Sequence, residues 1–67
     1  MSVLKVIEIL AHSDKSWEDA TQKAVDEAAK SVKNIKSVWL KDHSAEVENN
    51  KVTSYRVNAK ITFVVEH

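Results

Sequence analysis

The sequence predicts an α+β subunit of order β-α-β-β, in which a three-stranded antiparallel sheet wraps around one helix. Three observations predict it. Val3–Ala11 is an aliphatic and β-branched run, the segment after Ser16 spaces apolar residues at helical intervals, and two long segments of period two flank Asn49-Asn50. With 67 residues, the chain is expected to form a single domain over residues 1–67.

The first strand is expected over Val3–Ala11, and the polar residues after it end it. Ser16 is placed to cap a helix, with Asp19 three residues later as in a capping box. The apolar residues that follow at helical spacing are Trp17, Ala20, Ala24, Ala28 and Val32. This stripe of small side chains lets a helix lie close to a sheet. We expect about 18 residues of helix ending at Asn34, because Asn tolerates the left-handed conformation.

The rest of the chain predicts a long β-hairpin, with strands Lys36–Glu48 and Lys51–Glu66 joined by Asn49-Asn50 in a type I′ turn. Glu48 then pairs with Lys51, and this pairing sets the register. The core face is expected to carry Tyr55, Val57, Ala59, Ile61, Phe63 and Val65, opposite Val38 and Leu40. The other face is expected to carry Ser37, Trp39, Lys41 and His43, opposite Arg56, Asn58, Lys60 and Thr62.

The lengths of these elements predict a homo-oligomer. Strands of about 13–15 residues extend roughly 40–50 Å, whereas a helix of about 18 residues extends about 27 Å. One helix cannot cover such a sheet, and natural proteins avoid leaving long edges exposed. The chain has no Cys, so disulfides cannot stabilise its small core.

The composition excludes several classes of protein. The chain has no Gly, which excludes Gly-rich phosphate-binding loops. It also has no Cys, which excludes thiolate chemistry. Ten basic residues balance ten acidic ones, so we expect no nucleic-acid binding. The apolar runs are too short for a membrane span, and no signal-peptide pattern is present, so a cytoplasmic protein is expected. We find no Ser-His-Asp arrangement and no acid–base pair, so we do not expect an enzyme.

The order and lengths of the elements resemble the dodecin family. The residues that carry the resemblance are Lys5-Val6-Ile7-Glu8-Ile9, Ser13, Ser16-Trp17-Glu18-Asp19-Ala20, Ala28 to Val32, and Tyr55-Arg56-Val57 leading to Phe63. The resemblance covers essentially the whole chain. It implies a hollow homododecamer that binds FMN, FAD or riboflavin in stacked pairs at subunit interfaces, for storage or sequestration rather than catalysis.

Two family positions for flavin binding differ in this chain. The family's stacking Trp falls at Ser37, and the Gln that pairs with the polar edge of the flavin falls at Arg56. Ala11-His12-Ser13 also replaces the family's Gly-Thr-Ser. Trp39 lies two residues after Ser37 and so on the same face of the strand. It is our candidate for the stacking role, with burial at an oligomer interface as the alternative.

The cofactor-binding residues expected on this basis are Trp39, Ser37, Arg56 and His43. Arg56 would donate to a flavin carbonyl or phosphate, or else form an ion pair with Glu46, Glu48 or another acid. His43 is expected opposite Arg56, where it would tune binding with pH or remain a half-exposed polar residue.

The alternative reading is a flavin-free shell, either structural or binding calcium or another cation. Asp42, Glu46 and Glu48 would then gather around a symmetry axis and offer oxygen ligands. Their spacing is not that of a calcium loop, and we assign no metal ligands. His12, expected alone in the loop after the first strand, and the terminal His67 are given no metal role.

Overall fold

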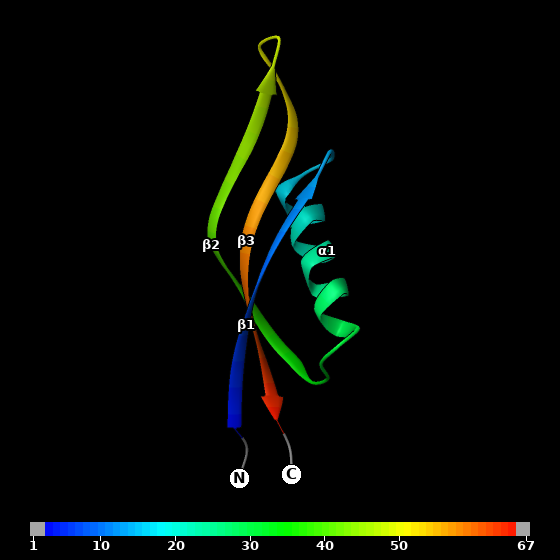
Figure 1. The fold of residues 1–67 in the computed structure, drawn as a ribbon, viewed down its shortest axis with the longest axis vertical. Helices are drawn as coiled ribbons and strands as arrows, with labels where there is room; N and C mark the ends of the chain where they lie inside the picture. The colour runs from blue at the N-terminus through cyan, green and yellow to red at the C-terminus, as the bar shows by residue number, and fades with distance from the viewer. Residues whose placement is uncertain (1–2, 66–67) are drawn as a thin grey trace.

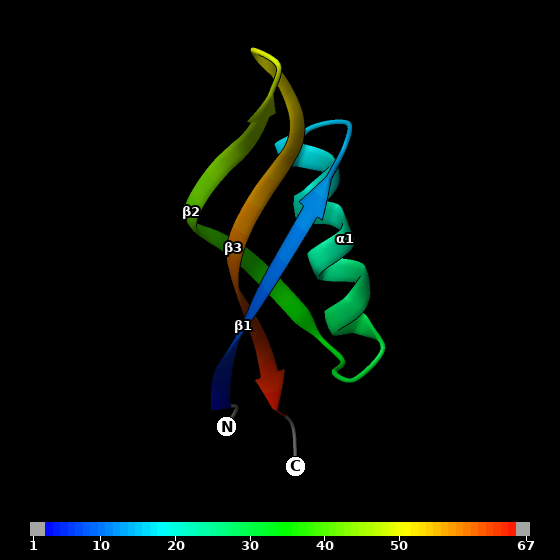
Figure 2. The same ribbon diagram turned by 45° about the horizontal axis from the view of Figure 1, so that its top comes forward.

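The computed structural model describes residues 3–65, which form one sheet and one helix (Figure 1). The elements are β1 (Val3–Ser13), α1 (Trp17–Ala29), β2 (Ile35–Glu48) and β3 (Lys51–Val65). The strand order is β1-β3-β2 and both pairings are antiparallel, so β3 is central. The predicted β-α-β-β order is confirmed. The sheet is strongly twisted, and α1 lies across one of its faces (Figure 2).

The core lies between α1 and the sheet and is built on small residues, as the sequence predicts. Ala20 and Ala24 are fully buried, and Ala28 is nearly so. Ala24 and Ala28 pack against Ala59 and Ile61 in the middle of β3, with aliphatic side chains of β1 and β2 around them. Small side chains on both elements allow the helix to approach the central strand closely.

The helix is shorter than predicted, with 13 residues rather than about 18. After Ala29 the chain tightens: the N–H groups of Ser31 and Val32 both donate to the carbonyl oxygen of Ala28, at 3.0 Å. Val32 then packs against the core from outside the helix. Asn34 has φ 62°, the left-handed conformation that was predicted, but it directs the chain into β2 and does not end the helix.

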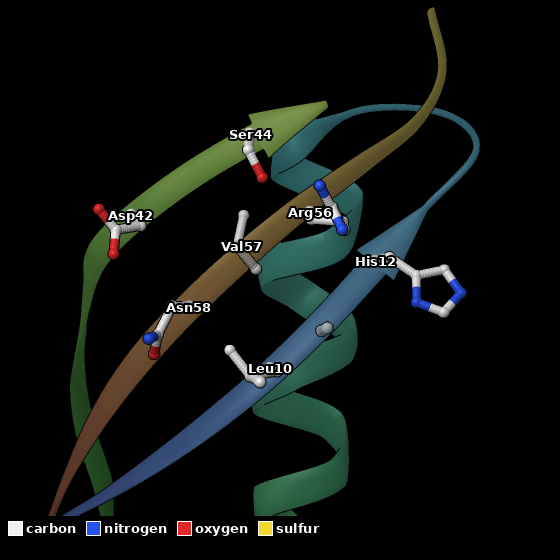
Figure 3. Close-up of a pocket in the computed structure, with 8 residues that line it drawn as sticks. Leu10, His12, Asp42, Ser44, Arg56, Val57 and Asn58 are labelled. Carbon is white, nitrogen blue, oxygen red and sulfur yellow. The ribbon is translucent and has the colours of Figure 1, made fainter. Parts of the chain in front are cut away.

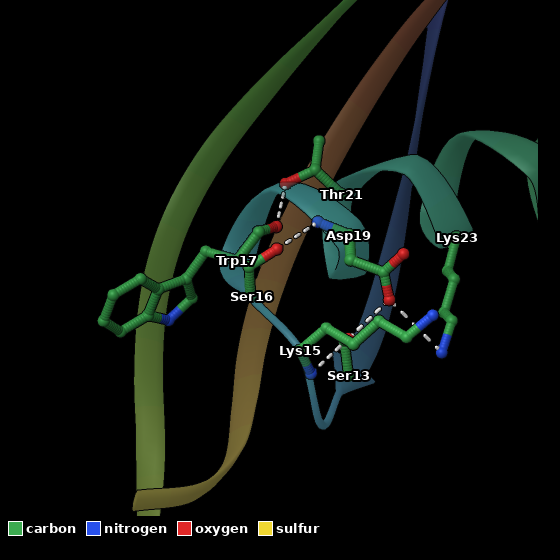
Figure 4. Close-up of polar contacts among 7 residues, drawn as sticks. All are labelled: Ser13, Lys15, Ser16, Trp17, Asp19, Thr21 and Lys23. Carbon is green, nitrogen blue, oxygen red and sulfur yellow. Dashed lines mark hydrogen bonds and ion pairs between the residues drawn. The ribbon is translucent and has the colours of Figure 1, made fainter.

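Ser16 caps the helix as predicted, with its Oγ accepting a 2.9 Å hydrogen bond from the N–H of Asp19 (Figure 4). The Asp19 carboxylate accepts a hydrogen bond from the Oγ of the buried Ser13 at the end of β1. That hydrogen bond, together with the ammonium of Lys23 at 3.5 Å, holds the pKa of Asp19 below its usual value. The first turn of the helix is thereby tied to the end of β1.

The hairpin turn is also as predicted. Asn49 and Asn50 have φ values of 52° and 66°, and Glu48 pairs with Lys51. Beyond the turn the register does not stay constant. It shifts between Glu46 and Val47, between Leu40 and Asp42, and again between Ile35 and Ser37. A β-bulge places one extra residue in one strand and so exchanges the faces of the residues beyond it.

The hairpin extends beyond the helix, at the top of Figure 1. The structure measures 52 Å along its longest axis, whereas 13 residues of helix extend about 20 Å. Val47 and Val52 pair across this outer part and are 60% and 50% exposed. One helix therefore leaves much of the sheet uncovered, as the predicted lengths require.

Candidate ligand-binding face

The face of the sheet turned away from α1 is called the open face here. Cross-strand pairing assigns its members. They are Leu4, Val6, Glu8, Leu10 and His12 on β1, Arg56, Asn58, Lys60, Thr62 and Val64 on β3, and Ser37, Trp39, Asp42 and Ser44 on β2. Leu4, Val6 and Leu10 are 62%, 57% and 77% exposed. The open face thus combines exposed apolar side chains with charged and polar ones.

Trp39 is the largest apolar side chain of the open face and is 63% exposed. It pairs with Lys60, whose Nζ lies 5.4 Å from the centre of the indole ring. This distance is within the range of a cation–π contact. Ser37 lies one pleat away and pairs with Thr62. The indole therefore presents a planar aromatic surface beside a row of polar side chains formed by Lys60, Ser37 and Thr62.

Beside this row the open face contains a hollow of about 420 Å³, which faces the viewer in Figure 3. It is lined by Leu10, Ala11, His12, Asp42, Ser44, Arg56, Val57 and Asn58. Two cross-strand rows form its floor: His12, Arg56 and Ser44 in one, and Leu10, Asn58 and Asp42 in the other. Each row takes one residue from each strand, so the geometry of the hollow depends on the register of the whole sheet.

Arg56 has a partner within the same chain. Its Nη1 lies 3.7 Å from Oε1 of Glu46, and both side chains are 51% exposed. A half-exposed ion pair of this kind contributes little to stability. A guanidinium carries five N–H donors, so this contact leaves others able to face the hollow. The ion pair with Glu46 was the alternative predicted for Arg56.

The predicted position of His43 is wrong. Between the register shift at Glu46/Val47 and the bulge at Leu40/Asp42, which adds Lys41 to β2, the pairing is displaced by one residue. The partner of His43 on β3 is therefore Val57 rather than Arg56. His43 consequently faces the helix side, where its ring meets Trp17 edge-on at 5.4 Å. It shares no face with Trp39, Ser37 and Arg56, which the structure does place together.

The open face also holds residues that strict alternation along the sequence does not place there. His12 lies within β1 rather than in a loop, and it pairs with Arg56. The same bulge turns Asp42 and Ser44 to the open face. A signal for the bulge is present in the sequence: apolar residues occupy even positions at Val38 and Leu40 but odd positions at Ala45 and Val47. A strict period of two cannot fit both.

Within residues 3–65, no three His, Asp or Glu side chains gather closely enough to hold a metal ion. In the same part of the chain, no helix is both long and apolar enough to span a membrane.

These features define a small α+β subunit with an aromatic and polar open face. The sequence matches the Dodecin family over residues 3–66, and the chain belongs to that family. It is 35% identical over 63 residues to a protein named calcium dodecin from Mycobacterium tuberculosis, covering 94% of this chain and 89% of the relative.

Solved structures show the same fold. A point mutant of the T. thermophilus dodecin superposes with a TM-score of 0.92 at 24% identity, over 100% of both chains. A dodecin from Streptomyces davaonensis gives 0.90 at 14% identity, covering 98% of this chain and 97% of its own. The M. tuberculosis calcium dodecin, described as calcium-chelating with a novel calcium-binding site, gives 0.80 at 31% identity, covering 96% and 91%.

Proposed function

We propose that the chain assembles into a hollow homododecamer that binds a flavin (FMN, FAD or riboflavin) on the open face and stores or sequesters it. The observation that carries this proposal is the 63% exposure of Trp39 beside a hollow lined by both apolar and polar residues. A flavin offers a planar ring system for stacking and polar atoms along one edge. The indole of Trp39 can stack on the planar ring, and Arg56 and Ser37 on the same face can form hydrogen bonds with the polar edge.

Assembly follows from the same surface. Exposed large apolar residues lie on the open face and in the outer hairpin. Burying them between copies would stabilise a core that is small for an independent domain. The family supports this arrangement, and the uncovered length of the hairpin requires a partner of some kind.

Flavin fluorescence tests the ligand. The wild type should quench riboflavin and FMN on titration, because an indole stacked on the ring provides a quenching route. Trp39→Ala should lose most of this quenching. Val47→Ala is the control, because it removes another exposed apolar side chain of β2 that is not on the open face. Equal quenching by wild type and Trp39→Ala would contradict the stacking role, and no quenching by the wild type would contradict flavin binding.

A second candidate is a flavin-free shell that binds calcium, favoured by the similarity to calcium dodecin. Asp42, Glu46 and Glu48 would supply oxygen ligands from several copies. Calorimetry with calcium chloride distinguishes the two functions. Heat of binding that disappears in an Asp42→Asn, Glu46→Gln double variant, with a colourless protein as purified, would favour the calcium shell.

A further inference from the structure

The exposed ring of Trp39 has a charged neighbour over it. The Nζ of Lys60 lies over the indole, 5.4 Å from the centre of the ring. Lys60 pairs directly with Trp39 between β3 and β2, and it is half-buried although it belongs to the open face. Long Lys side chains pack their stems along apolar surface and keep the charge near water. The ammonium therefore occupies part of the ring surface that a stacking ligand needs.

Lys60 has a second partner within reach on the other neighbouring strand. Glu8 of β1 pairs directly with it, and both residues belong to the open face. Side chains directly opposite one another in an antiparallel sheet have Cβ atoms about 4.5–5.5 Å apart, so the ammonium of a Lys can reach such a carboxylate. Glu8, Lys60 and Trp39 thus form one row across the three strands, with the Lys in the middle.

The ion pair that Glu8 makes leaves this second position accessible. Its Oε2 lies 3.9 Å from the Nζ of Lys41, and the two side chains are 46% and 50% exposed. A carboxylate has two oxygens and accepts more than one donor, so Glu8 can receive the ammonium of Lys60 without releasing Lys41. Exposed ion pairs and exposed cation–π contacts have comparable, small strengths. Lys60 consequently has two positions of similar free energy, one on the ring and one on the carboxylate.

We propose that Lys60 is a movable cover of the Trp39 ring, with Glu8 as its alternative partner. The ammonium lies on the indole and moves to Glu8 when a planar ligand stacks on the ring. The contact is autoinhibitory, because stacking must first break it. The inference rests on the proposed stacking of a flavin on Trp39 and adds to it a residue that regulates access to the ring.

Riboflavin affinities measure the cost of moving the cover. Riboflavin carries no charge, so removing a Lys does not change a long-range attraction between ligand and protein. Lys60→Thr shortens the side chain so that it no longer reaches the ring, and Thr suits a strand. This variant should bind riboflavin about two- to fivefold more tightly than the wild type, the change that corresponds to an exposed cation–π contact. Lys51→Thr, the same substitution in β3 beside the hairpin turn, should bind as the wild type does.

Glu8→Gln tests the alternative position. A neutral side chain no longer attracts the ammonium, so the cover stays on the ring and riboflavin should bind about two- to threefold more weakly. The same substitution should have little effect in a protein that already carries Lys60→Thr, because the cover is then missing. Equal effects of Glu8→Gln with and without Lys60→Thr would show that Glu8 acts on binding by itself, and would overturn its role as the alternative partner.

The cover can also be observed without a ligand. Protons held over an aromatic ring are shifted upfield in NMR spectra. The ε-methylene signal of Lys60 should therefore lie upfield of that of Lys51 in the wild type, and should move back toward it in Trp39→Leu. A Lys60 signal that does not differ between the wild type and Trp39→Leu would overturn the inference.

The failures of the two proposals are distinct. Equal or weaker binding of riboflavin by Lys60→Thr, at an unchanged mass in light scattering, overturns the cover but leaves flavin binding intact. Binding by Lys60→Thr and not by the wild type would support both proposals. If neither protein binds riboflavin, both proposals fall.

Discussion

The indole N–H of Trp17 donates a 2.9 Å hydrogen bond to the main-chain oxygen of Ser44, 27 residues further along the chain. The same ring meets His43 and Tyr55 edge-on, at 5.4 and 4.9 Å. The first residue of α1 is thereby joined to β2 beyond the Leu40/Asp42 bulge. This contact helps to set which residues of β2 face the helix, and hence which reach the open face.

Trp17→Phe tests the contribution of this hydrogen bond. The substitution keeps an aromatic ring but removes the donor, so the free energy of unfolding should fall by about 1 kcal/mol. Urea denaturation followed by circular dichroism measures it. Thr21→Ala is the control, because it removes an exposed hydrogen bond within the helix and should change stability much less. Equal stability of Trp17→Phe and wild type would contradict a role for the contact.

Ala24→Leu tests the close approach of helix and sheet. Ala24 is fully buried against β3, so a larger side chain has no space and should cost about 1–3 kcal/mol. Ala29→Leu serves as the matched substitution at an exposed position of the same helix and should lie within about 0.5 kcal/mol of wild type. Thermal melting of both variants provides the comparison, and similar losses in the two would argue against the tight packing.

Asn50→Ala tests the turn of the hairpin. With φ at 66°, the backbone of residue 50 is in the left-handed conformation. This conformation costs a residue with an apolar side chain, such as Ala, about 1–2 kcal/mol. Asn50→Gly should be nearly neutral, because Gly reaches this conformation freely. Denaturation midpoints of the two variants measure the difference. If Ala were tolerated as well as Gly, the left-handed turn would not be needed.

The turn also illustrates what the sequence could predict. Asn49-Asn50 between two runs of period two identifies the hairpin, and the Ala stripe identifies the buried side of α1, because both are local patterns. The shared face of Ser37 and Trp39 follows from alternation alone, which needs information from only one strand. Arg56 joins that face through the pairing of β2 with β3, which the Asn49-Asn50 turn makes predictable.

The errors occur where tertiary contacts override a local pattern. The helix ends at Ala29 because the chain must return to the sheet, although the sequence continues a helical spacing to Val32. His43 was placed on the wrong face because the bulge before Asp42 depends on pairing with β3. The hollow could not be predicted, since its rows combine three strands whose register is fixed only in the folded sheet.

The lowered pKa of Asp19 predicts a dependence of stability on acid. A carboxyl whose pKa is depressed on folding contributes stability that is full above its usual value of 3.8 and is lost as the pH falls through the folded value. Ser13→Ala removes the main cause of the shift and should reduce this dependence. Melting temperatures from neutral pH to about pH 2 compare the variant with wild type. Parallel curves would contradict the contribution of the Ser13–Asp19 pair.

The proposed assembly predicts a mass of about 90 kDa in light scattering, against 7.6 kDa for one chain. Leu10→Glu places a charge at the most exposed apolar side chain of the open face and should lower this mass if copies meet there. A wild-type mass near that of one chain would contradict the homododecamer.

Lys41 is the extra residue of the central bulge, and it has a consequence for how such chains diversify. Deleting Lys41 would give β2 one unbroken alternation of faces along both of its halves. Asp42 and Ser44 could then no longer share a face with Trp39. Substitutions at individual positions change what the open face carries, but only an insertion or deletion changes which positions belong to it. A single-residue gap in this strand would therefore change which side chains the open face carries, even where all the aligned residues are identical.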